Sequence, residues 1–155
     1  MSEQGGQQPG PQFALQRIYL KDASFESPKA PESFRAQWNP KINLELNSRH
    51  AELEGGGVYE VVLSVTVTAQ NDNEEVVYLA EVQQAGVFTA TGFPQDALEQ
   101  TLSSFCPNVL FPYAREVIDS MVTKGSFPAL MLAPVNFDAL YEQARQQRES
   151  GQTTH

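Results

Sequence analysis

The segment from Val58 to Ala69 constrains the fold most strongly, because its apolar side chains recur at every second position. These side chains belong to Tyr59, Val61, Leu63, Val65 and Val67. A period of two places them on one face of a β-strand. The segment therefore predicts a long strand with one apolar face.

Three further segments predict strands of the same sheet. Residues 42–47 alternate between apolar and polar side chains, and residues 76–84 follow Asn71-Asp72-Asn73, a composition typical of a turn. Residues 13–26 are also compatible with a strand, but their apolar phase slips between Leu15 and Ile18. The slip indicates a β-bulge or a strand that is apolar on both faces. Four antiparallel strands are predicted in the first half of the chain.

Strict alternation in residues 13–26 also assigns side chains to faces. It places Asp22, Ser24 and Glu26 on one face, and Tyr19, Ala23 and Phe25 on the other. The connection that follows, residues 28–40, contains three prolines and the only tryptophan, Trp38. It is too long for a hairpin and is predicted to be a crossover loop.

The second half of the chain predicts helices. Residues 95–105 form a short helix that is expected to end at Pro107, because proline lacks a backbone donor and restricts the residue before it. Pro112 suits an early position of a second helix, and Gly125 suits its C-terminal cap. The apolar stripe of this helix consists of Leu110, Ala114, Val117, Ile118 and Met121.

An extended apolar segment, residues 127–135, precedes the last predicted helix. Asn136 is expected to cap that helix, with Asp138 in its first turn. Strands followed by helices make the fold class α+β. The predicted domain covers residues 12–147, between a disordered tail at residues 1–11 and a flexible tail at residues 148–155.

Charge and composition exclude several classes of protein. The formal net charge of -9 over 155 residues argues against binding nucleic acid or an anionic membrane. The single cysteine excludes an internal disulfide and fits a reducing compartment. The N-terminus has no secretory signal pattern, and no apolar run could span a bilayer. We expect a cytoplasmic protein without membrane insertion.

Candidate catalytic groups are few. His50 and His155 lie apart from other metal ligands in the sequence, so no metal site or cofactor is predicted. Cys106 precedes a proline in an apolar context, which favours an inert thiol over the nucleophile of a small hydrolase. The three glycines at residues 55–57 lack the Lys-Ser/Thr of a phosphate-binding loop. The sequence therefore predicts no enzyme.

Several blocks of the sequence resemble one known family. They are Arg17-Ile-Tyr-Leu-Lys-Asp-Ala-Ser-Phe-Glu-Ser-Pro, Val58-Tyr-Glu-Val-Val-Leu, Glu81-Val-Gln-Gln-Ala-Gly-Val-Phe, Cys106-Pro-Asn-Val-Leu-Phe-Pro-Tyr-Ala-Arg-Glu and Leu132-Ala-Pro-Val-Asn-Phe-Asp. In this order they resemble the SecB protein-export chaperones. The resemblance extends from about residue 13 to residue 147.

The resemblance implies a four-stranded antiparallel sheet with helices on one face, assembled as a homotetramer, a dimer of dimers. It implies an ATP-independent chaperone that holds unfolded secretory precursors and delivers them to the SecA motor. The residues implied in SecA binding are Asp22, Glu26, Leu79 and Glu81. A SecB-like chaperone dedicated to one partner, such as a toxin-antitoxin pair, is the alternative.

Two further sets of residues follow from the same resemblance. The implied client groove lies between the crossover loop, the sheet and the last helix, and its expected lining is Phe34, Trp38, Ile42, Leu44, Met131, Phe137 and Tyr141. By residue type alone, packing over the sheet is favoured over a groove for such apolar groups. The expected tetramer interface comprises Tyr19, Ala80, Val82, Gln84, Ala114, Ile118 and Met121.

Overall fold

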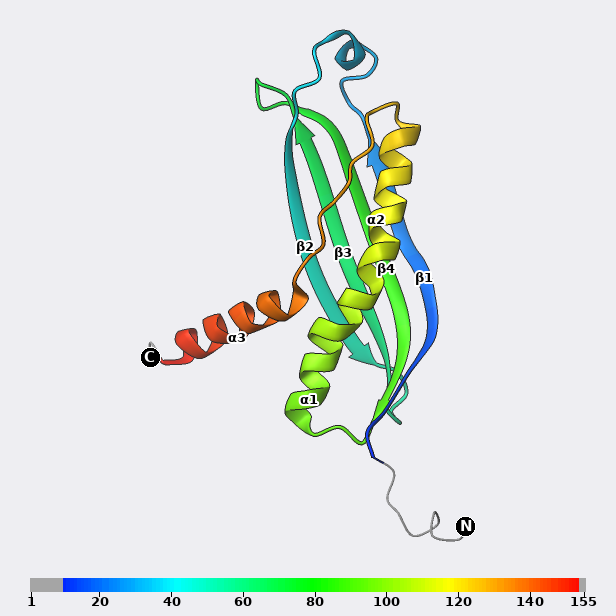
Figure 1. Cartoon of the computed structure of the whole chain (residues 1–155), viewed down its shortest axis with the longest axis vertical. Helices are drawn as coiled ribbons and strands as arrows, with labels where there is room; N and C mark the ends of the chain where they lie inside the picture. Colours follow the sequence, from blue (N-terminus) through cyan, green and yellow to red (C-terminus); the bar gives the residue numbers. More distant parts are fainter. Residues whose placement is uncertain (1–9, 154–155) are drawn as a thin grey trace.

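Four antiparallel strands form the sheet that the alternation predicts, in a computed structural model that describes residues 10–153 (Figure 1). The strands are β1 (Gln12–Glu26), β2 (Lys41–Glu52), β3 (Val58–Gln70) and β4 (Val76–Thr91). Their order across the sheet is β1-β4-β3-β2, so β1 and β2 are the two edges. The crossover loop, with the short 3-10 helix η2 (Glu32–Arg35), therefore connects one edge of the sheet to the other.

Strand β1 contains two bulges, of which the sequence predicted one. Its register against β4 shifts between Leu15 and Arg17, at the predicted slip, and again between Leu20 and Asp22. Each bulge inserts one residue and resets the alternation. Tyr19 consequently lies on the same face of the sheet as Asp22, and its predicted placement on the opposite face is wrong.

The helices α1 (Gln95–Gln100), η3 (Thr101–Phe105) and α2 (Cys106–Lys124) follow one another without interruption. The expectation that the first helix ends at Pro107 is therefore wrong. The segment η3 is a π-helical turn in which the Cys106 amide donates to the Thr101 carbonyl. Pro107, which has no backbone N–H to donate, directly follows this π-turn at the second residue of α2.

Pro112 lies inside α2 and not near its beginning. A proline at this position leaves the carbonyl of Asn108, four residues earlier, without its helical partner. Both residues are exposed, so water can reach that carbonyl. The helix continues to Lys124, and Gly125 follows as its C-cap, as predicted.

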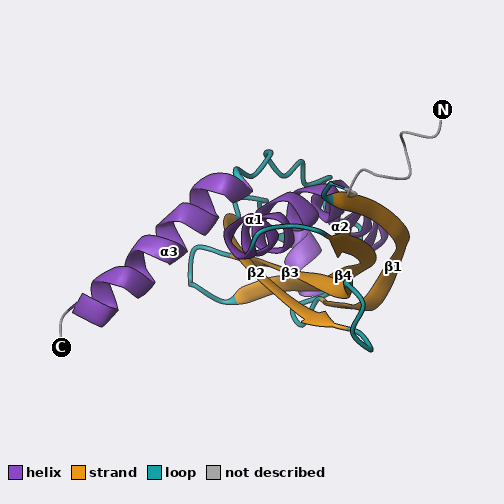
Figure 2. Cartoon of the chain, turned by 90° about the horizontal axis from the view of Figure 1, so that it is seen from below, coloured by secondary structure: helices purple, strands orange, loops and turns teal. Residues whose placement is uncertain are grey.

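The core lies between the sheet and the helical layer, which covers one face only (Figure 2). The side chains of the helical layer that face the sheet recur at every fourth position. They are Leu102, Cys106, Leu110, Ala114, Ile118 and Val122, with exposed fractions of 0–2%. Because four residues turn a helix by about 400°, this stripe rotates by about 40° at each step. The helical layer can thus follow a twisted sheet.

The last helix, α3 (Phe137–Thr153), begins after an extended segment, as predicted. The Asn136 side chain accepts a hydrogen bond from the Ala139 amide at 3.0 Å, which is the expected cap. The helix continues past residue 147, where the domain was predicted to end. Residues 1–9 of the predicted N-terminal tail and residues 154–155 lie outside the described part. No helix within residues 10–153 is long and apolar enough to cross a membrane.

Candidate functional site

Aromatic side chains meet beneath the crossover loop and form the first part of the candidate site. We call Phe25, Phe34, Trp38, Tyr78 and Phe127 the aromatic cluster. Phe127 lies at its centre, with ring centroids 5.0 Å from Tyr78, 5.3 Å from Phe34 and 5.4 Å from Trp38. Trp38 also stacks on Tyr78 at 6.2 Å. These distances are typical of favourable aromatic pairs.

The aromatic cluster is only partly covered. Phe127 and Tyr78 are buried, whereas Phe34 is 48% exposed and Trp38 is 38% exposed. Burial raises the pKa of the Tyr78 hydroxyl, and the nearby Asp119 carboxylate raises it further. The cluster therefore has an apolar floor and an accessible aromatic rim.

Gly125 leaves the space that this arrangement needs. A Cβ atom at this position would lie 2.5 Å from the Phe25 ring and 3.3 Å from the Phe127 ring. The left-handed backbone conformation falls one residue later, on Ser126 with φ of 69°. Gly125 is thus required by close packing rather than by its φ angle.

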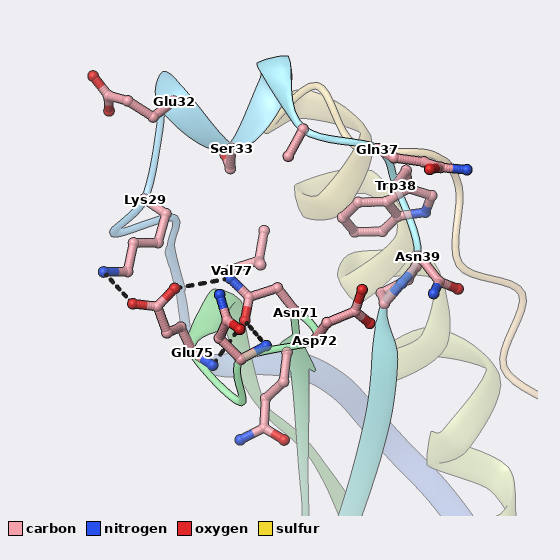
Figure 3. Close-up of a pocket in the computed structure, with 14 residues that line it drawn as sticks. Lys29, Glu32, Ser33, Gln37, Trp38, Asn39, Asn71, Asp72, Glu75 and Val77 are labelled. Carbon is pink, nitrogen blue, oxygen red and sulfur yellow. Dashed lines mark hydrogen bonds and ion pairs between the residues drawn. The ribbon is translucent and has the colours of Figure 1, made fainter.

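A hollow of about 360 Å³ adjoins Trp38 between the crossover loop and the β3–β4 turn (Figure 3). Its other walls are mostly polar. Lys29 pairs with Glu75 at 3.2 Å, and the Asn71 amide donates to the same carboxylate at 3.0 Å. Both contacts lower the pKa of Glu75, and the hydrogen bond from Asn71 makes the larger contribution. Trp38 thus contacts the other rings of the aromatic cluster and also borders the polar hollow.

A second hollow, of about 390 Å³, lies where α3 passes the edge of the sheet. We call it the α3 hollow. Its apolar walls are Leu46, Leu63, Phe137, Leu140, Tyr141 and Ala144. Glu99 and Arg148 supply charge at its border, and His50 lies 3.8 Å from Glu99.

The seven residues expected in the client groove divide between these places. Phe34 and Trp38 belong to the aromatic cluster, and Phe137 and Tyr141 to the α3 hollow. Ile42 and Leu44 lie on β2 between them, on the helix-covered face. Met131 is 89% exposed and lines neither hollow. Phe137 is only 6% exposed, because it packs against Phe111.

Three residues of this region were absent from the expected lining. Phe25 and Tyr78 lie on the helix-covered face of their strands, and Leu46 continues the row of Ile42 and Leu44. Period-two parity could have found Leu46, which shares a face with Ile42 and Leu44. Parity places Tyr78 with Ala80 and Val82, which were expected at the tetramer interface, so it gave no signal toward the groove for that residue.

The four residues expected to bind SecA lie together on the opposite, outer face of the sheet. Glu26 pairs with Leu79, Ser24 pairs with Glu81, and Asp22 pairs with Gln83 in the register of β1 and β4. Directly paired residues of antiparallel strands point to the same face. The three carboxylates are exposed and Leu79 is half-buried. We call these four residues the acidic patch.

A hydrogen-bonded group lies further along the outer face. The Tyr19 hydroxyl donates to Glu60, and the Lys21 ammonium lies 2.8 Å from the same carboxylate. The Lys21 and Tyr19 hydrogen bonds lower the pKa of Glu60. Burial, with Glu60 contributing, raises the pKa of Tyr19 to about 12. The group holds edge strand β1 to β3 across β4.

Most residues of the expected tetramer interface are covered by other parts of their own chain. Five of its residues are covered by their own chain, with exposed fractions of 0–3%: Ala80, Val82, Gln84, Ala114 and Ile118. They lie between the sheet and the helical layer of the single chain. Gln84 donates instead to the Tyr19 carbonyl at 3.0 Å, beside the second bulge. Tyr19 and Met121 keep partial exposure.

The Cys106 thiol and the potential metal ligands were the remaining candidates for chemistry. Cys106 is 0% exposed, and burial raises the pKa of its thiol to about 12. The thiol is therefore protonated at neutral pH and is a poor nucleophile. Within residues 10–153, no three potential ligands among His, Cys, Asp and Glu gather to hold a metal ion.

Comparison with known proteins identifies the family. The model of the family described as preprotein translocase subunit SecB matches residues 6–148. The protein-export protein SecB of Pseudomonas savastanoi pv. phaseolicola is 58% identical over 145 residues, which cover 93% of this chain and 88% of the relative. Its counterpart in Pseudomonas fluorescens Pf0-1 is 60% identical over 144 residues, with coverage of 92% and 88%.

A solved structure supports the fold. The SecB-like chaperone Rv1957 of Mycobacterium tuberculosis, in complex with a ChAD peptide from the HigA1 antitoxin, superimposes with a TM-score of 0.66. The match covers 79% of this chain and 90% of the other at 19% identity, a likeness of fold alone. Because the family model spans nearly the whole chain and the relatives are identical at more than half of the aligned positions, the chain belongs to the SecB family.

Proposed function

We propose that the chain is an ATP-independent chaperone that holds unfolded secretory precursors and delivers them to SecA. The relatives with 58–60% identity are named protein-export protein SecB. The alternative, a chaperone dedicated to a toxin-antitoxin pair, corresponds to the relative with 19% identity and is not favoured. The proposed role requires binding and release of unfolded precursors and no catalytic group. Its proposed location is the cytoplasm.

The observation that supports client binding most directly is the half-covered aromatic cluster. Its rim, Phe34 and Trp38, gives a client's apolar side chains an accessible surface to pack on, while the buried rings of Phe127 and Tyr78 hold this rim in place. Aromatic side chains provide a large contact area with few rotatable bonds. Ile42 and Leu44 extend this surface along β2 toward the α3 hollow. An extended apolar segment can follow this path, which selects for unfolded chains rather than for one sequence.

The acidic patch supports the second half of the proposal, delivery to SecA. Asp22, Glu26 and Glu81 present negative charge on the sheet face opposite the aromatic cluster. A partner that contacts this face through basic groups gains both orientation and association rate. Client and SecA would then occupy different faces of one sheet, so the two can bind at the same time.

Assembly as a dimer of dimers is also part of the proposal. In the single chain, Leu15 and Leu20 on edge strand β1 are 46% and 47% exposed, although they lie on the helix-covered face. Tyr113 of α2 is 50% exposed as well. These side chains, with Tyr19 and Met121, offer apolar area for contact between copies, whereas the five covered residues do not.

Native mass measurement with and without an unfolded client tests the proposed function. We expect a homotetramer that gains the mass of a chemically unfolded precursor and ignores the same precursor after folding. Several unrelated unfolded proteins should be held. A monomer that ignores every unfolded client would contradict the proposal.

A further inference from the structure

One buried hydroxyl contacts the first turn of α3. Ser104 in η3 is 2% exposed, and its hydroxyl donates a hydrogen bond to the Asp138 carboxylate in the first turn of α3. Among the described residues, Ser104 and Gln84 are the only buried polar or charged residues. A buried hydroxyl requires a partner, and a carboxylate is a strong acceptor. The pair therefore joins two segments that are far apart in the sequence.

The rest of α3 has little other support. Only its beginning packs into the core, through Phe137 against Phe111, with ring centroids 5.9 Å apart. Its principal neighbour is η3, the turn that contains Ser104. Residues 142–149 are all exposed, and Figure 2 shows α3 leaving the body of the molecule at an angle. The helix is fixed at one end and free along most of its length.

The geometry of η3 brings Ser104 to this position. The π-helical hydrogen bond from Cys106 to Thr101 spans one residue more than an α-helical bond. The extra residue rotates the helix locally, so that Leu102 and Cys106 both face the sheet while Ser104 faces α3. Such π-turns occur frequently at functional sites.

We propose that Ser104 is a positioning residue that sets the direction of α3 and thereby the shape of the α3 hollow for clients. The proposal rests on the proposed function, since it assigns Ser104 a role in client holding. Phe137, Leu140 and Tyr141 supply one wall of the hollow from α3, and Leu46 and Leu63 supply the facing wall from the sheet. A change in the direction of α3 changes the distance between these walls.

Hydrogen exchange of the full-length assembly tests the positioning role. A helix of this length is marginal without tertiary support, so loosening its first turn should release its later turns. In Ser104→Ala, we expect amides 140–149 to exchange about tenfold faster than in the wild type, while α2 is unchanged. Asp138→Asn keeps an acceptor oxygen, so its exchange rates in α3 should lie between those of the wild type and Ser104→Ala. Ser104→Ala combined with Asp138→Ala should add little to either single change.

Ser103→Ala is the matched control for the exchange measurement alone, because Ser103 itself borders the α3 hollow. It removes the same hydroxyl one residue earlier, where the partner is Glu99 of α1 at 3.2 Å and not a residue of α3. Exchange in α3 that is equal in Ser104→Ala and the wild type, or equally fast in Ser103→Ala, would overturn the proposal. It would also be overturned if α3 loosens in Ser104→Ala but the affinity for an unfolded client stays the same as in the wild type. A wild-type protein that holds no client would contradict the proposed function instead. The exchange data would then still show whether the Ser104–Asp138 hydrogen bond holds α3 in place.

Discussion

The two faces of the sheet differ in what covers them. On one face, side chains such as Val65 and Val82 pack under α2 and are almost completely buried. On the other face, neighbouring residues of the same strands, Thr66 and Glu81, lie outside the core. Alternation along each strand thus supplies both a core and a surface. The comparison teaches that one set of strands can build a packed core on one side and an exposed acidic surface on the other.

The strongest test of this difference is a truncation in the core. Ile118→Ala removes a side chain that is 0% exposed between α2 and the sheet. We expect a loss of about 2–4 kcal/mol in the free energy of unfolding, because a cavity is added to the lost burial. Thr66→Ala on the outer face should change it by less than about 0.5 kcal/mol. Denaturant unfolding at fixed protein concentration measures both, and similar losses would erase the distinction between the faces.

The aromatic cluster can be tested at its exposed rim. Trp38→Ala removes a ring that stacks on Tyr78 and packs at a tilt against Phe127, and we expect roughly tenfold weaker binding of an unfolded client. Leu53→Ala is the matched control, since Leu53 is also 38% exposed but lies in the turn at the far end of the sheet. Titration calorimetry with one unfolded precursor compares the two. Equal losses would mean that exposed apolar area matters and the position does not.

A smaller effect is expected from the hydrogen-bonded group on the outer face. The lowered pKa of Glu60 means that its contribution to stability is present above the unfolded pKa of about 4.3. That contribution is lost as the pH falls through the lower folded value. We expect Glu60→Gln to cost about 1 kcal/mol at pH 7 and progressively less toward pH 3. Urea unfolding at several pH values measures this difference, and a cost independent of pH would contradict the ionic origin.

The strands were predictable because alternation is a local property of the sequence. Each residue from Leu63 to Val67 shows its face by its polarity, and the slip after Leu15 is visible as two apolar residues out of phase. The second bulge, between Leu20 and Asp22, has no such signal. Leu20 lies on the helix-covered face but is 47% exposed, and Lys21 and Asp22 are both polar. Alternation alone could not locate that bulge.

The candidate site was predictable only in part. Parity grouped Asp22 with Glu26 and Leu79 with Glu81, and the register places all four on one face. Parity does not tell what covers a face, however. Val82 of the sheet and Ile118 of α2 were therefore assigned to contacts between copies. Within one chain, both belong to the core between the sheet and the helical layer. The helix continued through Pro107 for a related reason, since a π-turn depends on packing over the sheet rather than on local propensity.

The central claim, that the two faces bind different partners, is tested most directly by charge reversal in the acidic patch. The double variant Asp22→Lys with Glu26→Lys changes only exposed side chains of the outer face. Glu52→Lys with Glu54→Lys makes the same change of charge at the opposite end of the sheet and is the control. Affinities for SecA and for one unfolded precursor are measured on all three proteins. We predict that the acidic-patch variant binds SecA at least about tenfold more weakly and holds the precursor like the wild type. Unchanged SecA affinity, or an equal loss of precursor binding, would contradict the account.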